Sequence, residues 1–151
     1  MRYAISLRKD SNGTYLVAVP DLPDAITFGV TPADARRQAV DAIETAMMAR
    51  MSDREAIPLP KVKGREYVEL RPAVTAKVAL WNAMLRQGLG KAAMARKLKW
   101  HLPQVDRVLD VRHESAIATL SDALRAAGQS LAISVSPARP ARRIQVPRKA
   151  A

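Results

Sequence analysis

The first 30 residues of the chain contain two short runs in which apolar and polar positions alternate. The apolar positions are Tyr3, Ile5 and Leu7, followed by Tyr15, Val17 and Val19. A period of two is typical of a strand that buries one face. Residues 10–13 (DSNG) separate the two runs, and Asn and Gly tolerate the positive φ angles of a tight turn. The pattern therefore predicts an antiparallel hairpin.

The next pattern combines a short strand, a long helix and a last strand. Residues 20–24 (PDLPD) break the alternation, and residues 26–28 (ITF) predict a third strand. Residues 31–34 (TPAD) predict a helix start, because they offer a capping hydroxyl, a proline at the first helical position and an acid in the first turn. Apolar residues spaced by three and four extend that helix over residues 32–52.

Two prolines make residues 53–65 a loop or irregular edge, and residues 67–70 predict a fourth strand. The order β-β-β-α-β predicts a small α+β domain over residues 1–70. We place the boundary at Arg71-Pro72, after which the periodicity becomes helical. Val74, Val78, Trp81 and Leu85 form one stripe, and Gly88 is a natural helix stop.

Residues 94–109 (MARKLKWHLPQVDRVL) predict two short helices joined by a tight turn. Ala95 is the small residue at which the helices cross, and apolar residues follow it at +3, +5, +10 and +13. Pro103 inside one continuous helix would cost ~3 kcal/mol, whereas the first turn of a new helix tolerates it. Lys99 occupies the turn position where the chain is commonly left-handed, at a cost on the order of 1 kcal/mol for a residue other than glycine.

The remaining chain predicts one more helix, a terminal strand and a tail. Ser115 is the expected cap, and Gly128 the expected stop, of a helix whose buried stripe is Ile117, Leu120, Leu124 and Ala127. Leu131, Ile133 and Val135 alternate as a lone strand, so we expect this strand to pair with a second copy in a homodimer or higher oligomer. We therefore expect an all-helical domain over residues 71–135, with a dimerisation strand, and a disordered basic tail over residues 136–151.

Composition limits the classes of protein that fit this pattern. Hydrophobic residues make up 48% of the 151 residues, which is enough for a packed core. The chain has no cysteine and two histidines, so we expect no metal site and no cofactor, and a reducing, cytoplasmic compartment. No apolar run approaches the roughly 20 residues of a membrane span, and the first ten residues lack a signal peptide's apolar block.

The positive charge is concentrated in the second half of the chain. Residues 1–70 contain ten basic and ten acidic residues, residues 71–135 contain ten basic and four acidic, and residues 136–151 contain five basic and no acidic. This distribution accounts for the net charge of +11. A neutral front half and a basic back half indicate a second module that faces a polyanion such as DNA.

The second short helix presents polar groups suited to the major groove. Gln104 matches adenine and Arg107 matches guanine, while His101 at the helix start can reach a base or a phosphate. The expected phosphate contacts are Lys91, Lys97, Lys99 and Arg112. The Asp106 carboxylate would repel the phosphate backbone of DNA. We therefore expect it to pair with a nearby cation or to accept a hydrogen bond from a cytosine amino group.

Several stretches together resemble the HicB antitoxin family, in the version with a helix-turn-helix of the Xre/Cro type. The front half contributes residues 19–23 (VPDLP) and 29–35 (GVTPADA), and the back half contributes residues 76–78 (AKV), 94–98 (MARKL) and 104–113 (QVDRVLDVRH). Asp24, Asp34 and Lys99 depart from the usual pattern. The resemblance covers the chain up to the tail, and it rests on the order and spacing of these stretches.

This resemblance implies a partially ribonuclease H-like front domain that binds and masks a HicA-type toxin, an RNA-cleaving protein with a double-stranded-RNA-binding fold. The back domain would bind the promoter of its own operon and repress it. Two other functions are alternatives to this one. A metal-dependent nuclease would need converging carboxylates, but Asp10, Asp21 and Asp24 fall at turns, and Asp34, Asp41 and Glu44 suit the solvated face of the helix, so we expect no enzyme. A one-component regulator with a ligand-sensing front domain is the second alternative.

Overall fold

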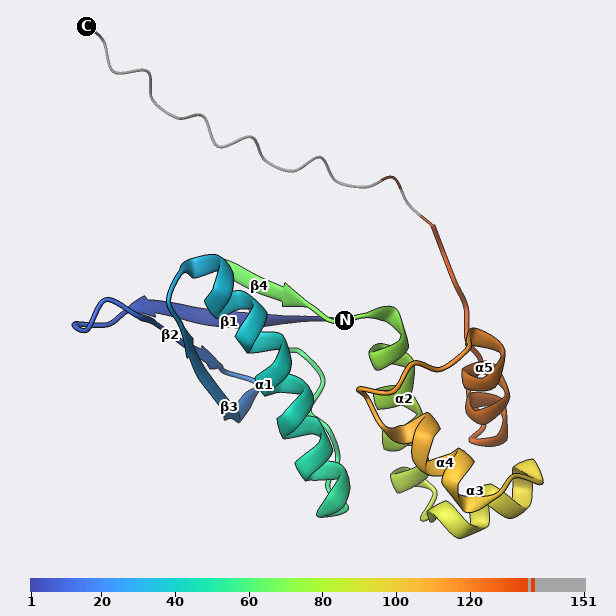
Figure 1. Cartoon of the computed structure of the whole chain (residues 1–151). Helices are drawn as coiled ribbons and strands as arrows, with labels where there is room; N and C mark the ends of the chain where they lie inside the picture. The colour runs from blue at the N-terminus through green and yellow to red at the C-terminus, as the bar shows by residue number, and fades with distance from the viewer. Residues whose placement is uncertain (136, 138–151) are drawn as a thin grey trace, which may run out of the picture.

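The computed structural model describes residues 1–135 and residue 137. A four-stranded antiparallel sheet and one long helix form the front part, and four helices form the back part (Figure 1). The strands are β1 (Arg2–Lys9), β2 (Tyr15–Val19), β3 (Leu22–Gly29) and β4 (Glu66–Glu69). The helices are α1 (Pro32–Ser52), α2 (Pro72–Arg86), α3 (Lys91–Leu98), α4 (Leu102–Leu109) and α5 (Ile117–Ala126). The predicted α+β class and the β-β-β-α-β order are confirmed.

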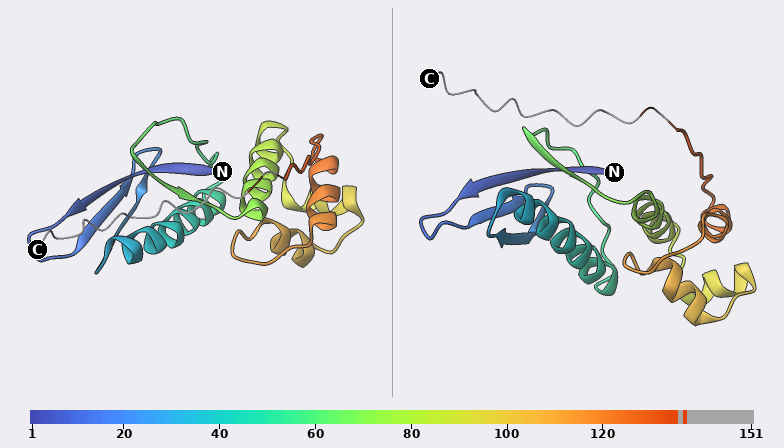
Figure 2. Two further views of the ribbon diagram at one scale, coloured as in Figure 1. Left: turned by 90° about the horizontal axis from the view of Figure 1, so that it is seen from above. Right: turned by 45° about the horizontal axis from the view of Figure 1, so that its top comes forward.

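The sheet has the strand order β3-β2-β1-β4, and α1 lies across one of its faces (Figure 2). The predicted hairpin is present, with Leu7 opposite Val17 and Lys9 opposite Tyr15. The alternation is confirmed for Tyr3, Ile5 and Val17, which are buried, but Ala4 on the other face of β1 is buried as well, beside Gly64.

The third strand is longer than the sequence predicts, since it begins at Leu22 instead of Ile26. It contains Pro23, which we expected to lie in a break between strands. β3 is an edge strand of the sheet, and a proline without an N–H is tolerated there because one side of the strand forms no ladder. A register shift between Ala18 and Val19 accompanies the turn between β2 and β3.

The start of α1 is determined by local chemistry, as the sequence predicts. The Thr31 hydroxyl accepts a hydrogen bond from the Asp34 N–H at 3.1 Å, and Pro32 is the first helical residue. Gly29 precedes this cap, and a Cβ atom built on it would lie 2.3 Å from the backbone nitrogen of Ala35. Only glycine therefore allows β3 to approach α1 this closely.

The back part contains the predicted helix break, but the last helix differs from the prediction. α5 begins after Ala116, which offers no side-chain cap, so the assignment of Ser115 as the cap was wrong. Ile117 is 60% exposed, so its assignment to the buried stripe was also wrong, whereas Leu120, Leu124 and Ala127 are buried.

One buried core runs through both parts of the molecule. The indole N–H of Trp81 in α2 donates to the Glu55 carbonyl at 2.7 Å, which ties the back part to the loop after α1. Residues 129–135 pair with no strand elsewhere in the described part of the chain, so the dimerisation strand remains a prediction. The tail prediction falls on residues that, apart from 137, lie outside the described ones. None of the helices within residues 1–135 has the length and hydropathy of a membrane span.

Candidate nucleic-acid interface

Helices α3 and α4 are separated by a tight turn at Lys99–His101. Lys99 adopts the left-handed conformation expected from its position, with φ 55° and ψ 38°. The backbone N–H of Trp100 donates a hydrogen bond to the Ala95 carbonyl at 2.9 Å, which stabilises the turn. Met94 of α3 and Val105 of α4 are completely buried, so the two short helices share one core. The two short helices and the tight turn between them are therefore present, as the sequence predicts.

The outer surface of α4 carries the side chains predicted to read bases. His101, Gln104 and Arg107 are all exposed. The Gln104 side-chain carbonyl accepts a hydrogen bond from the His101 N–H at 2.8 Å, which caps the start of α4. An amide oxygen has two lone pairs and its NH₂ group two donors, so Gln104 keeps enough capacity to bind an adenine edge.

Three of the four cations predicted to contact phosphates have protein partners in this structure. The Lys91 ammonium pairs with Asp106 at 2.7 Å, which supplies the cation that we expected near Asp106. The Lys97 ammonium donates to the Ala126 carbonyl at the end of α5, at 2.6 Å. The Arg112 guanidinium donates to the Thr45 hydroxyl of α1, at 2.6 Å. These pairs are exposed, so the cost of exchanging them for DNA phosphates is small.

A buried lysine holds the end of α4. Lys77 lies in the apolar stripe of α2 and is fully buried, and its ammonium donates to the carbonyls of Asp110 and His113 at 2.6 Å each. Burial lowers the pKa of Lys77, and the nearby Asp110 carboxylate opposes that shift. The sequence offered one signal for this role, because a lysine stands between Val74 and Val78 on an otherwise apolar face.

Arg71 ties the same turn to the front part of the molecule. Its guanidinium donates to the Val111 carbonyl at 3.1 Å and pairs with Glu114 and, at 3.4 Å, with Glu44 of α1. Glu44 is only 6% exposed, so its assignment to the solvated face of α1 was wrong. Periodicity could not reveal this, because the face of α1 that carries Glu44 is covered by a segment distant in sequence.

Two of the carboxylates considered for a nuclease site bind other groups of the chain. Asp21 accepts the N–H groups of Lys61 and Val62 at 3.0 Å each, and Asp24 pairs with Arg50 at 2.7 Å. Within residues 1–135, no three potential ligands from His, Cys, Asp and Glu come together as a metal site would require.

The fold and the site define a two-part α+β protein, in which an antiparallel sheet with one long helix is joined to four shorter helices. Comparison with protein families matches residues 2–79 to the HicB-like antitoxin of bacterial toxin–antitoxin systems. The chain is 36% identical to Antitoxin HicB 1 of Photorhabdus laumondii over 135 residues, covering 89% of this chain and 87% of that protein. It is 32% identical to Antitoxin HicB of Escherichia coli K12 over 135 residues, covering 88% and 98% of the two chains. The chain therefore belongs to the HicB-like antitoxin family.

Proposed function

We propose that this antitoxin binds and masks a HicA-type, mRNA-cleaving toxin through residues 1–70 and represses its own operon through the helix-turn-helix. The family membership supports a toxin partner. The DNA-binding part of the proposal is supported by the chain reversal at Lys99–His101, which leaves Gln104 and Arg107 exposed on one short helix.

In this proposal the exposed residues divide into base and phosphate contacts. Gln104 binds adenine, Arg107 binds guanine, and His101 contacts a base or a phosphate. The phosphate contacts are Lys91, Lys97, Lys99 and Arg112. The two carbonyls held by Lys77 keep the end of α4 in place, so the helix is presented to the groove in one orientation.

The antitoxin acts in the cytoplasm as a homodimer or higher oligomer in this proposal. Ile133 is 64% exposed and Val135 is 95% exposed, and alternating apolar residues of this kind gain a buried face by pairing with a second copy. Deletion of residues 129–151 should therefore lower the mass measured by analytical ultracentrifugation. An unchanged mass would contradict the assignment of the strand.

The decisive experiment separates the two activities in the full-length chain. Arg107→Ala should weaken binding to the chain's own promoter DNA by about 1–3 kcal/mol and relax the sequence preference. The same variant should still rescue growth when it is co-expressed with the toxin from the neighbouring gene. Arg86→Ala is the matched control, because Arg86 is an exposed arginine of the same part that lies outside α3 and α4.

Unchanged promoter affinity in Arg107→Ala, with Arg86→Ala equally unchanged, would contradict the assignment of α4 to the groove. Growth arrest that the wild-type chain cannot relieve would contradict the proposed toxin partner.

A further inference from the structure

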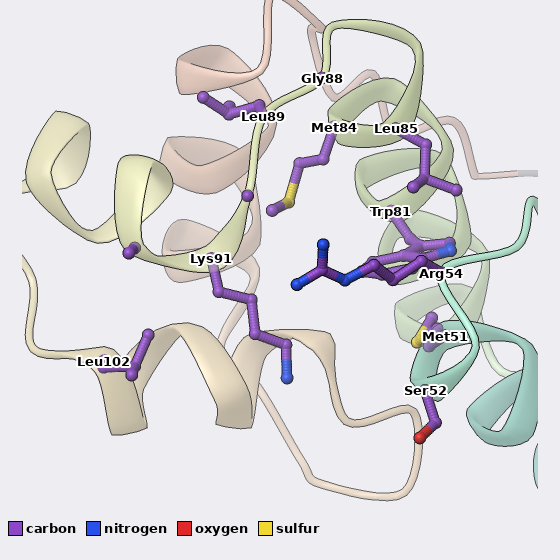
Figure 3. A pocket seen from close by; sticks show the side chains of 12 residues that line it. Met51, Ser52, Arg54, Trp81, Met84, Leu85, Gly88, Leu89, Lys91 and Leu102 are labelled. Carbon is purple, nitrogen blue, oxygen red and sulfur yellow. The ribbon is translucent and has the colours of Figure 1, made fainter.

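A pocket of about 650 Å³ opens where the end of α1 meets the back part of the molecule (Figure 3). The front part contributes Met51, Ser52 and Arg54, and α2 contributes Trp81, Met84 and Leu85. The start of α3 and the first residue of α4, Leu102, complete the lining. The pocket therefore borders both helices of the helix-turn-helix on one side and the toxin-binding part on the other.

Arg54 stands out among the residues that line this pocket. Its φ angle is 59°, a left-handed conformation that glycine, and to a lesser degree asparagine, adopts more readily than arginine. Its guanidinium extends into the pocket, as Figure 3 shows, and no carboxylate among the described residues forms an ion pair with it. This conformation ends α1, because the Glu55 N–H donates to the Arg50 carbonyl at 2.8 Å, and it directs the Arg54 side chain away from the helix.

The pocket combines cations at its opening with apolar walls. Arg54 and Lys91 supply the positive charge, and Leu102, which is 47% exposed, supplies accessible apolar surface. A DNA strand has matching chemistry, because each phosphate anion is flanked by the apolar face of a deoxyribose. Lys91 pairs with Asp106, an exposed pair that a phosphate can replace, so Arg54 is the stronger site for an incoming anion.

The position of the pocket is also compatible with a DNA strand. The C-terminal end of α1 reaches the same end of the molecule as α3 and α4, both in Figure 1 and in the right-hand view of Figure 2. A duplex whose major groove holds α4 passes its backbone beside the flanks of that helix, and Leu102 and Lys91 mark the flank toward α1.

We propose that Arg54 of the toxin-binding part, together with Lys91, contacts a backbone phosphate of the DNA held by α4. The DNA interface then spans both parts of the chain. This inference rests on the proposed DNA binding, and it adds a contact in residues 1–70, where the sequence predicted only toxin binding.

The test is Arg54→Gly in the full-length chain, because glycine removes the charge and also removes the backbone strain. The probe is a labelled duplex of mixed sequence, since a phosphate contact is independent of sequence. One lost phosphate contact reduces the slope of log K against log salt concentration by about 0.9, and affinity near 0.1 M salt should fall roughly five- to tenfold. Arg54→Lys should retain most of the slope, because it keeps the charge.

Arg65→Ala is the matched control, because Arg65 is an exposed arginine in the loop before β4, away from the pocket. The melting temperature of Arg54→Gly should be equal to or above that of the wild type, which excludes unfolding as the cause of weaker binding. An unchanged slope in Arg54→Gly, measured beside a weakened Arg107→Ala, would overturn the phosphate contact and leave the proposed function standing. Loss of toxin binding with unchanged DNA binding would also overturn it, because the pocket would then hold the protein partner.

Discussion

The side chain of Asn82 forms two hydrogen bonds with the backbone of Ile57, and both residues are buried. The Ile57 N–H donates to the amide oxygen of Asn82 at 2.9 Å, and the amide nitrogen donates back to the Ile57 carbonyl at 2.9 Å. Asn82 lies in α2 and Ile57 in the loop after α1. The two parts of this antitoxin are therefore joined by a buried polar pair inside a continuous core.

Asn82→Ala should destabilise the whole chain. The substitution leaves the Ile57 N–H and carbonyl buried without partners, and each such group costs about 1–3 kcal/mol. We expect a loss of about 2–4 kcal/mol in the free energy of unfolding, measured by urea titration. Gln129→Ala, which alters an exposed amide, should stay within about 0.5 kcal/mol of the wild type. An equally small effect of Asn82→Ala would show that the two parts are not coupled through this pair.

Tyr3 should make the protein lose stability at alkaline pH. Its hydroxyl donates to the Pro58 carbonyl at 2.6 Å, and burial, assisted by the negative charge of Asp21, raises the pKa of Tyr3 to about 12. The raised pKa stabilises the folded state fully below pH 10, and this contribution is lost as the pH rises from 10 to about 12. The loss amounts to about 2–3 kcal/mol for a shift of this size.

The measurement is the free energy of unfolding against pH for the wild type and for Tyr3→Phe. The phenylalanine variant should be less stable at neutral pH, because the Pro58 carbonyl loses its donor, and its stability should fall less steeply above pH 10. Parallel curves for the two proteins would rule out Tyr3 as the cause of the alkaline loss.

Lys77→Met should disturb the position of α4 without changing the charged side chains on the exposed surface of that helix. Methionine fills the buried volume but leaves the Asp110 and His113 carbonyls without their donor, so we expect a cost of about 2–4 kcal/mol in stability. Promoter affinity should fall while the salt dependence of binding stays unchanged, because no phosphate contact is removed. A reduced salt slope would show instead that Lys77 reaches the DNA.

Gly29→Ala should disturb the front part severely. The added Cβ would lie 2.3 Å from the Ala35 nitrogen and 2.5 Å from its Cα, and both atoms belong to the backbone of α1. The helix must shift to admit it, and overpacking of this kind costs about 1–3 kcal/mol or more. Thermal unfolding measures the effect, and Gly90→Ala is the control, because a Cβ at Gly90 meets nothing within 4 Å. A wild-type melting temperature for Gly29→Ala would mean that α1 moves away from β3 without cost.

Local patterns in the sequence predicted most of the secondary structure. The bounds of α1 agree with the prediction of 32–52, because a capping hydroxyl and a proline act within one turn of the helix start. Lys99 was expected to be left-handed, because the apolar spacing around it requires the chain to reverse there. The errors at Ser115 and Ile117 arose because a helix start without a capping side chain leaves no local signal.

The sequence by itself determined the order of the strands and helices, the break before α4 and the excess of positive charge in the back half, since each depends on residues within a few positions of one another. Only the tertiary structure decided that Glu44 is buried and pairs with Arg71, and that Asn82 forms hydrogen bonds with the backbone of Ile57. It also decided that Arg54 and Lys91 line the same pocket. These relationships join residues 25 or more positions apart, and they depend on how the back part packs on α1 and the loop after it, and on the cost of burying a polar group without a hydrogen bond.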